Sequence, residues 1–128
     1  MFIQVTKGIK VSVQTKFEGT FFKNYKMHYA FEYTITIENQ NKEPVQLTAH
    51  HWNIFDSLKE METLDGEGVI GKKPVIKSGK NYTYSSGALL TSPIGAMKGF
   101  FQMTNIISNH EFLVEVPTFK FASAFVLN

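Results

Sequence analysis

Three glycines, Gly66, Gly68 and Gly71, have the spacing of a dinucleotide-binding loop, and Lys72 and Lys73 follow them directly. Glycine permits positive φ angles, so successive backbone amides in such a loop can cup an anion. The two lysines would add positive charge. These five residues are therefore candidates for holding a phosphate or pyrophosphate group.

The chain that follows this glycine loop argues for a structural bend instead. A dinucleotide loop opens into a helix whose N-terminus holds the pyrophosphate. Here Pro74 is followed within a few residues by the turn signal Lys77-Ser78-Gly79-Lys80, which leaves no room for a helix. We interpret the glycine loop as a tight connection between extended segments, with anion binding as the alternative.

Two adjacent histidines, His50 and His51, are candidate metal ligands, with Asp56 as a third. Imidazole nitrogens suit cobalt, whereas magnesium prefers oxygen ligands, and no carboxylate cluster has the spacing of a magnesium cage. Consecutive residues of a regular strand point to opposite faces, so the two histidines could share an ion only across a bulge. Further ligands could come from distant positions: His28, His110 and Glu115.

Three aromatic residues, Phe21, Phe22 and Tyr25, lie in a segment that we expect to be a loop, residues 18–26. Contiguous exposed rings usually mark a contact surface for another protein or for a second copy of the chain. The alternative is that these rings fold back and cap one end of the core. They are the interface candidates of this sequence.

Composition narrows the classes of function. The chain has 128 residues, enough to bury a sizeable core, and we expect a single domain over residues 1–128. The net charge is only +2 and arginine is absent, so sequence-specific binding of nucleic acid is not expected. The absence of cysteine excludes disulfides, thiolate nucleophiles and cysteine-bound metals.

No stretch of the chain has the pattern of a membrane span or of a signal peptide, so we expect a cytoplasmic protein without membrane insertion. No motif places a nucleophile beside a base, since Ser85 and Ser86 do not lie in a strained elbow. We therefore predict that the protein is not an enzyme and needs no cofactor.

Hydrophobic alternation predicts β-strands along the chain. Apolar residues occupy every second position over most of residues 9–17 and again over 27–37, and residues 39–44 have the composition of a hairpin turn. Shorter extended pieces follow, separated by glycine, proline or asparagine: residues 60–64, 75–76, 82–85, 97–104 and 112–116.

The third strand contains an irregularity. Its apolar residues change phase between Leu47 and Trp52, which predicts a β-bulge near residues 49–51 that keeps both side chains on one face. A tryptophan on the third strand is typical of immunoglobulin-like cores. The sequence thus predicts an all-β fold, an antiparallel β-sandwich of the immunoglobulin or fibronectin type III kind.

Several segments follow one another in an order that is specific to one family. In sequence they are Thr34–Asn39, Glu43–Leu47, His51-Trp52, Gly66–Gly71, Tyr84–Gly87, Met97–Gly99 with Gln102-Met103, and Glu115–Phe119. With these segments the sequence resembles the ApaG family over nearly its whole length, from Val11 to Phe121.

The resemblance implies an immunoglobulin- or fibronectin-like sandwich, in agreement with the strand pattern. It also implies a link to cobalt tolerance and magnesium efflux, as in bacterial members, and a role in protein interaction, as for related domains of larger eukaryotic proteins, including an F-box protein. The family offers no established catalytic residues to transfer. We expect a non-catalytic module that binds an unidentified protein partner, with self-association left open and the link to Co²⁺ and Mg²⁺ indirect. The alternative is direct binding of a divalent cation near His50 and His51, or of phosphate at the glycine loop.

The sequence differs from the usual ApaG pattern in three places. His50 and Lys98 stand where arginine is common in the family, so a role that needs a guanidinium group is not expected here. The first loop of the family is usually polar and acidic, whereas this chain carries Phe21 and Phe22. The surface around these rings is therefore expected to differ from that of relatives.

Overall fold

The computed structural model describes residues 1–123, and all of its regular secondary structure is β. The strands are β1 (Phe2–Thr6), β2 (Ile9–Lys23), β3 (Lys26–Asn39), β4 (Val45–Asp56), β5 (Glu62–Glu67), β6 (Val75–Ile76), β7 (Asn81–Leu90), β8 (Ile94–Asn105) and β9 (Glu111–Ala122). No helix in residues 1–123 is long and apolar enough to span a membrane. The predicted all-β fold is confirmed.

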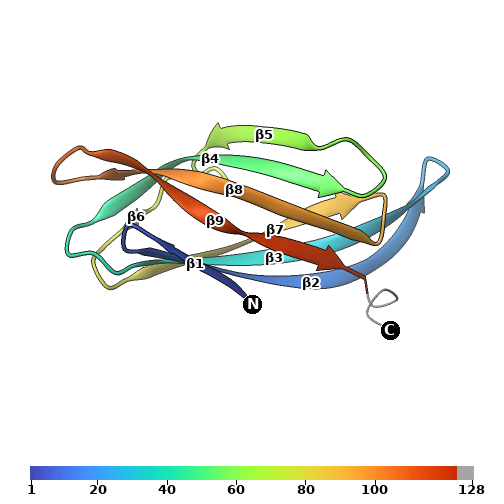
Figure 1. Ribbon diagram of the computed structural model, residues 1–128, viewed down its shortest axis with the longest axis horizontal. Coiled ribbons are helices and arrows are strands. Elements are labelled where there is room, and N and C mark those ends of the chain that lie inside the picture. The colour runs from blue at the N-terminus through green and yellow to red at the C-terminus, as the bar shows by residue number, and fades with distance from the viewer. Residues whose placement is uncertain (124–128) are drawn as a thin grey trace.

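The strands form two antiparallel sheets that pack face to face (Figure 1). One sheet has the order β1-β2-β3-β7, and the other has the order β5-β4-β8-β9, with the short β6 paired to β4 beside β5. On one side of the sandwich, β1 and β2 pack against β9. On the other side the edge strands β5 and β7 are separated by a cleft, described below.

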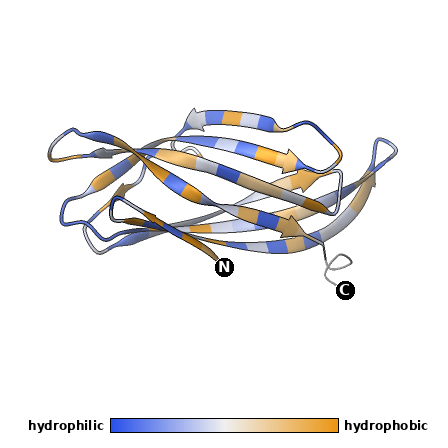
Figure 2. Ribbon diagram, viewed as in Figure 1, coloured by the Kyte–Doolittle hydropathy of each residue, from blue (hydrophilic) through white to orange (hydrophobic). Residues whose placement is uncertain are grey.

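Apolar side chains from both sheets meet between the layers. Apolar and polar residues alternate along most strands (Figure 2), so one face of each strand is buried, as a two-layer fold requires. Trp52 on β4 is 5% exposed and packs edge-on against Phe101 and Phe119. The predicted antiparallel sandwich with a buried tryptophan is therefore confirmed.

The segment 18–26 is not a loop, which corrects the prediction. β2 continues to Lys23, and β3 begins at Lys26, so the chain forms a two-residue hairpin turn at Asn24 and Tyr25. Both turn residues have positive φ angles, 52° and 62°, as a type I′ turn requires. This hairpin end, residues 18–28, extends past the second sheet (Figure 1), and we call it the arm.

The segment 39–44 is also different from the prediction. It carries the chain from β3 in one sheet to β4 in the other, so it is a crossover and not a hairpin. The buried side chain of Asn39 holds it: Nδ2 donates to the carbonyl oxygens of Glu43 and Ile76, both at 2.9 Å, and Oδ1 accepts from the amide of Asn41.

The predicted bulge in the third strand is present, slightly earlier than expected. The pairing of β4 with β8 shifts register between Leu47 and Ala49, after which His50 and His51 pair regularly with Phe101 and Phe100. The shift keeps both Leu47 and Trp52 in the core, at 0% and 5% exposure. The register shift also determines that His50, and not His51, points inward.

Candidate functional site

The glycine loop begins within β5, since Gly66 and Glu67 are the last two residues of that strand. A tight turn follows at Ile70 and Gly71, which have φ angles of 49° and 70°. Val69 and Lys72 close the turn: the amide of Val69 donates to the carbonyl of Lys72 at 2.8 Å, and the amide of Lys72 donates back at 3.0 Å. The sequence prediction of a bend between extended segments matches this geometry.

The backbone of this loop leaves few groups for an anion. The amide of Gly68 donates to the carbonyl of Thr48 at 2.8 Å, and a Cβ at Gly68 would collide with the carbonyl oxygen of Lys72. Lys73 pairs with Glu67 at 3.4 Å, on the surface. Gly68 therefore allows a close approach of two backbone segments, and anion binding by Gly66, Gly68, Gly71, Lys72 and Lys73 stays a prediction.

The two histidines lie on opposite faces of β4, because no bulge separates them. The ring of His50 points inward and its Nδ1 lies 2.5 Å from the carbonyl oxygen of Gly68. The ring of His51 points outward, stacks on Phe100 with 4.8 Å between centroids, and places Nδ1 2.5 Å from Oδ1 of Asp65. The structure does not bring the two imidazoles to one ion.

The other suggested metal ligands are also scattered. The buried Asp56 accepts hydrogen bonds from the turn between β7 and β8, whereas His28 lies in the arm beside Phe21. His110, in the turn between β8 and β9, stacks on Phe112 of β9. Within residues 1–123 no group of three or more histidine, aspartate or glutamate side chains is placed to hold a metal ion.

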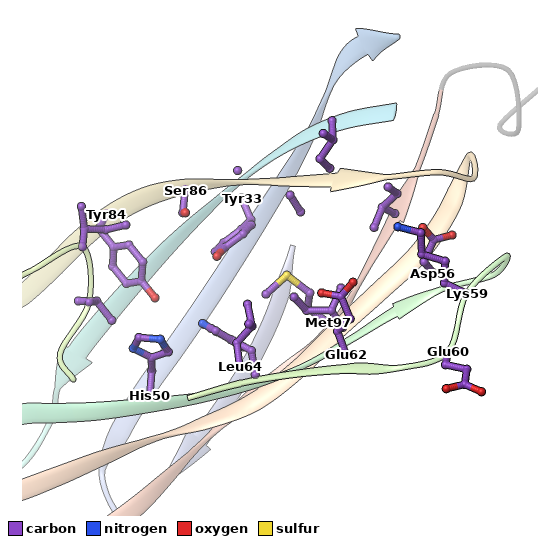
Figure 3. Close-up of a pocket in the computed structure, with 18 residues that line it drawn as sticks. Tyr33, His50, Asp56, Lys59, Glu60, Glu62, Leu64, Tyr84, Ser86 and Met97 are labelled. Atoms are coloured by element: carbon purple, nitrogen blue, oxygen red, sulfur yellow. The ribbon is translucent and has the colours of Figure 1, made fainter. Parts of the chain in front are cut away.

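The sequence did not predict the cleft between β5 and β7, which has a volume of about 380 Å³ (Figure 3). Tyr33, Trp52 and Met97 form its floor, and Leu64 and Ile70 lie at its rim. At one end are Tyr84 and His50, and at the other are Asp56, Lys59, Glu60 and Glu62. One signal could have been seen in the sequence: Tyr82, Tyr84 and Ser86 alternate along a strand without a charged residue.

Two tyrosine hydroxyls lie inside the cleft. Burial raises the pKa of Tyr33, and a hydrogen bond with Ser86 offsets part of that effect. Burial also raises the pKa of Tyr84 far above its usual range, and proximity to Tyr33 and Tyr82 raises it further. The Tyr84 hydroxyl is buried and has no hydrogen-bond partner within residues 1–123. Tyr84 therefore remains protonated and presents a donor to the cleft.

The three candidate interface rings lie in the arm. Phe21 is 42% exposed and stacks on the ring of His28, Phe22 is 67% exposed, and Tyr25 at the turn is 94% exposed. The rings therefore do not fold back to cap the core. The directly opposite neighbour of Phe22 is Met27, which is 44% exposed.

Comparison with known proteins identifies the family of this sandwich. Residues 20–105 match the ApaG domain. The chain belongs to the ApaG family. It is 36% identical to the ApaG protein of Methylocella silvestris over 98% of this chain and 96% of that protein, and 39% identical to the ApaG protein of Vibrio campbellii over 94% of each. The resemblance noted in the sequence is thus confirmed.

A solved structure with the same fold is also similar in sequence to this chain. The crystal structure of a Bordetella pertussis protein described as ApaA superposes with a TM-score of 0.83 at 29% identity, covering 91% of this chain and 94% of that one. In this ApaG chain the His50 ring fills the space over Gly66, and Nζ of Lys98 lies 5.6 Å from the ring centre of Phe55.

Proposed function

We propose that this ApaG-family protein is a non-catalytic module that binds another protein through the arm. The proposal depends chiefly on one observation, the uncovered inner face of the arm. Phe22 and Met27 lie directly opposite each other. The pairing of β3 with β7 starts only at Tyr29, so no strand of the sandwich lies beside this pair on the β3 side. Neighbouring large apolar side chains that stay in solvent usually mark a surface that a partner covers.

The arm holds these side chains in a defined arrangement. The pairs Phe21 with His28 and Phe22 with Met27 continue the ladder of β2 and β3 up to the type I′ turn. In Figure 2 the end of β2 is coloured as apolar, next to the polar turn. Because strand pairing orders the backbone that carries the rings before contact, no backbone ordering is needed when a partner binds.

The charges at the tip suggest what the partner carries. Lys23 and Lys26 are directly opposite each other on either side of the turn, and both are exposed. Like charges in this position repel, and acidic groups on a partner would relieve the repulsion. We infer an apolar contact centre with an acidic rim on the partner.

The non-catalytic part of the proposal is supported by how the polar side chains are used. His50 bonds a backbone carbonyl, His51 pairs with Asp65, and the hydroxyl of Ser85 bonds Thr34 on the outer face. Within the described residues these contacts do not align a serine hydroxyl with a histidine base, as nucleophilic catalysis would need. Turnover by the purified protein would contradict this part.

The cellular setting of the proposal is supported by the resemblance to the ApaG family. We propose that residues 1–128 act as one domain in the cytoplasm, and that binding of the partner affects cobalt tolerance and magnesium efflux indirectly. A second copy of the chain is the other partner to consider.

Affinity capture from the native host, with and without added cobalt, tests the proposal. The wild-type protein is compared with the double variant Phe22→Ser/Tyr25→Ser and with Ile107→Ser, a control that changes a 65% exposed side chain in the turn between β8 and β9. We expect the double variant to keep its melting temperature and to lose the partner, and the control to keep both. A drop of several degrees in the double variant would mean that the rings stabilise the fold, and would contradict the proposal.

A further inference from the structure

The edge strands of the two sheets are protected unequally against pairing with another chain. Natural edge strands carry charges, proline, bulges or short lengths that prevent such pairing. β1 has only five residues, β5 contains three acidic residues, and β9 contains Pro117 together with a register shift. β7 has ten residues, none of them charged or proline, and pairs with β3 without a shift. Its other edge has no strand partner within residues 1–123.

The unprotected edge of β7 borders the cleft. The inward-facing side chains of β7 from Tyr84 onward, Tyr84, Ser86, Ala88 and Leu90, line the cleft, and β5 forms the opposite wall. A volume of about 380 Å³ accommodates a few side chains but not a folded element. An extended segment laid along β7 would pair its backbone with the strand and place alternate side chains in the cleft.

The polar groups at the Tyr84 end fit a peptide group. Nδ1 of His50 faces a carbonyl oxygen, which only accepts, so Nδ1 carries a proton, and in the tautomer protonated there Nε2 is an acceptor. The Tyr84 hydroxyl, buried and without a partner in the described chain, is a donor. A donor and an acceptor on neighbouring walls match the C=O and N–H groups of an amide (Figure 3).

The opposite end of the cleft is acidic, although the whole chain has a net charge of +2. Glu60 and Glu62 are exposed at this end, and Lys59 is the basic residue among the side chains that line it. Asp56 is already occupied by hydrogen bonds from Thr91 and Ser92. The two glutamates therefore favour a basic side chain on the occupant.

We propose that an extended segment of a partner protein adds to the edge of β7 as a further strand, with apolar side chains over Tyr33 and Trp52 and a lysine or arginine side chain at Glu60 and Glu62. This surface is separate from the arm, so the inference goes beyond the proposed function and fails or holds independently of it. A small amine would fill the acidic end but would leave the backbone edge of β7 unpaired.

Selection from a phage-displayed library of random peptides, each about eight residues long to span most of β7, supplies the probe. We expect enriched peptides to contain lysine or arginine with an apolar residue two positions away. The blocked synthetic form of the most enriched peptide is then titrated. On binding, amides along the cleft edge of β7 should become protected from hydrogen exchange.

Two matched variants locate the peptide. Leu64 at the rim of the cleft and Leu113 on β9 are both 48% exposed, so Leu64→Lys and Leu113→Lys make the same change at equal exposure. We expect Leu64→Lys to weaken binding at least about tenfold by repelling the basic side chain, and Leu113→Lys to leave it unchanged. Tyr84→Phe should weaken it about fivefold through loss of one hydrogen bond.

Any one of the following outcomes would overturn this inference. The first is that no peptide is enriched on the wild-type protein relative to the Leu64→Lys protein, and the second is that the two lysine variants bind the peptide equally well. The third is that the peptide binds without protecting the amides of β7 from hydrogen exchange. The fourth is that benzylamine, as a small amine, binds but no peptide does. Loss of the peptide in Phe22→Ser/Tyr25→Ser would place it on the arm, which also overturns the inference while leaving the proposed function standing.

Discussion

The imidazole ring of His50 lies over Gly66, so close that a Cβ at position 66 would come within 2.7 Å of Cε1 of the ring. The two residues are directly paired on β4 and β5. The missing side chain lets the ring lie flat against the neighbouring strand and reach the carbonyl oxygen of Gly68. The first glycine of the loop thus makes room for the ring of a histidine.

We predict that Gly66→Ala lowers the free energy of unfolding by about 1–3 kcal/mol, because the ring must move and its partly buried hydrogen bond to Gly68 is lost. Thermal denaturation measures the change. Gly87→Ala is the matched control, since a Cβ at position 87 meets its nearest atom at an ordinary 3.6 Å. Equal stability of the two variants would show that the contact between His50 and Gly66 is not needed.

A substitution at Ile70 is predicted to stabilise the protein, in contrast to Gly66→Ala. It is 60% exposed and adopts a φ angle of 49°, a conformation that β-branched residues disfavour. Asn-Gly is the preferred pair for a type I′ turn, so Ile70→Asn should raise the stability by about 1 kcal/mol. The melting temperature should rise by a few degrees, and Ile107→Asn, at an exposed position without positive φ, should show no rise. A fall for Ile70→Asn would mean that its apolar contacts outweigh the strain.

Asp56 links β4 to the turn between β7 and β8. Its Oδ2 accepts from the amide and hydroxyl of Thr91 at 2.7 and 2.9 Å, and its Oδ1 lies 2.7 Å from the hydroxyl of Ser92. Burial acts to raise the pKa of Asp56, but these hydrogen bonds and one from Leu58 outweigh it, so the pKa lies below its ordinary value of 3.8. The ionised form therefore stabilises the fold.

We predict that Asp56→Asn destabilises the protein by about 1–3 kcal/mol at neutral pH, because an amide group cannot accept all of these bonds. The folded pKa is lowered, so the stabilisation is fully present above 3.8 and is lost as the pH falls through the folded pKa. Urea titrations should show that the difference in free energy of unfolding between wild type and variant is smaller at strongly acidic pH than at neutral pH. Glu111→Gln, which changes an exposed carboxylate, is the control and should have the same free energy of unfolding as the wild type at both pH values. A gap that persists in acid would contradict the role of the charge.

The scattered histidines lead to a prediction about cobalt. Because His50 and His51 face opposite sides of β4, we expect calorimetry with Co²⁺ to show no saturable heat near neutral pH. A saturable heat that disappears in His51→Ala would instead assign a site to His51 and Asp65, which lie 2.5 Å apart. That result would favour direct cation binding over the indirect link.

Much of the sandwich was predictable because its strands bury one face. Ile9, Val11 and Val13 alternate with polar residues, and all three are fully buried. β1 escaped prediction because its apolar residues do not mark its inner face: Ile3 and Val5 are about half exposed, at 52% and 53%. A short edge strand can be placed only by its pairing with β2.

The arm was mistaken for a loop for a different reason. The register of β2 and β3 shifts between Phe17 and Gly19, so the apolar alternation breaks although the strand continues. The turn at Asn24 and Tyr25 also lacks the glycine that usually signals a hairpin. The rings were therefore identified as candidates but could not be placed.

The cleft could not be predicted from local sequence. Its two walls, β5 and β7, belong to different sheets and approach each other only because β4 and β3 position them. The alternation of Tyr82 and Tyr84 indicated an inward face, but not that the space beside it stays open. Pairing between distant strands determines this feature.

Photo-crosslinking at the arm tests the central claim most directly. A benzophenone amino acid in place of Tyr25, which is 94% exposed, should disturb the fold little. We predict that irradiation in the native host yields a discrete adduct with another protein, and that the same amino acid at Ile107 does not yield it. Absence of any adduct at Tyr25, or the same adducts from both positions, would contradict docking through the arm.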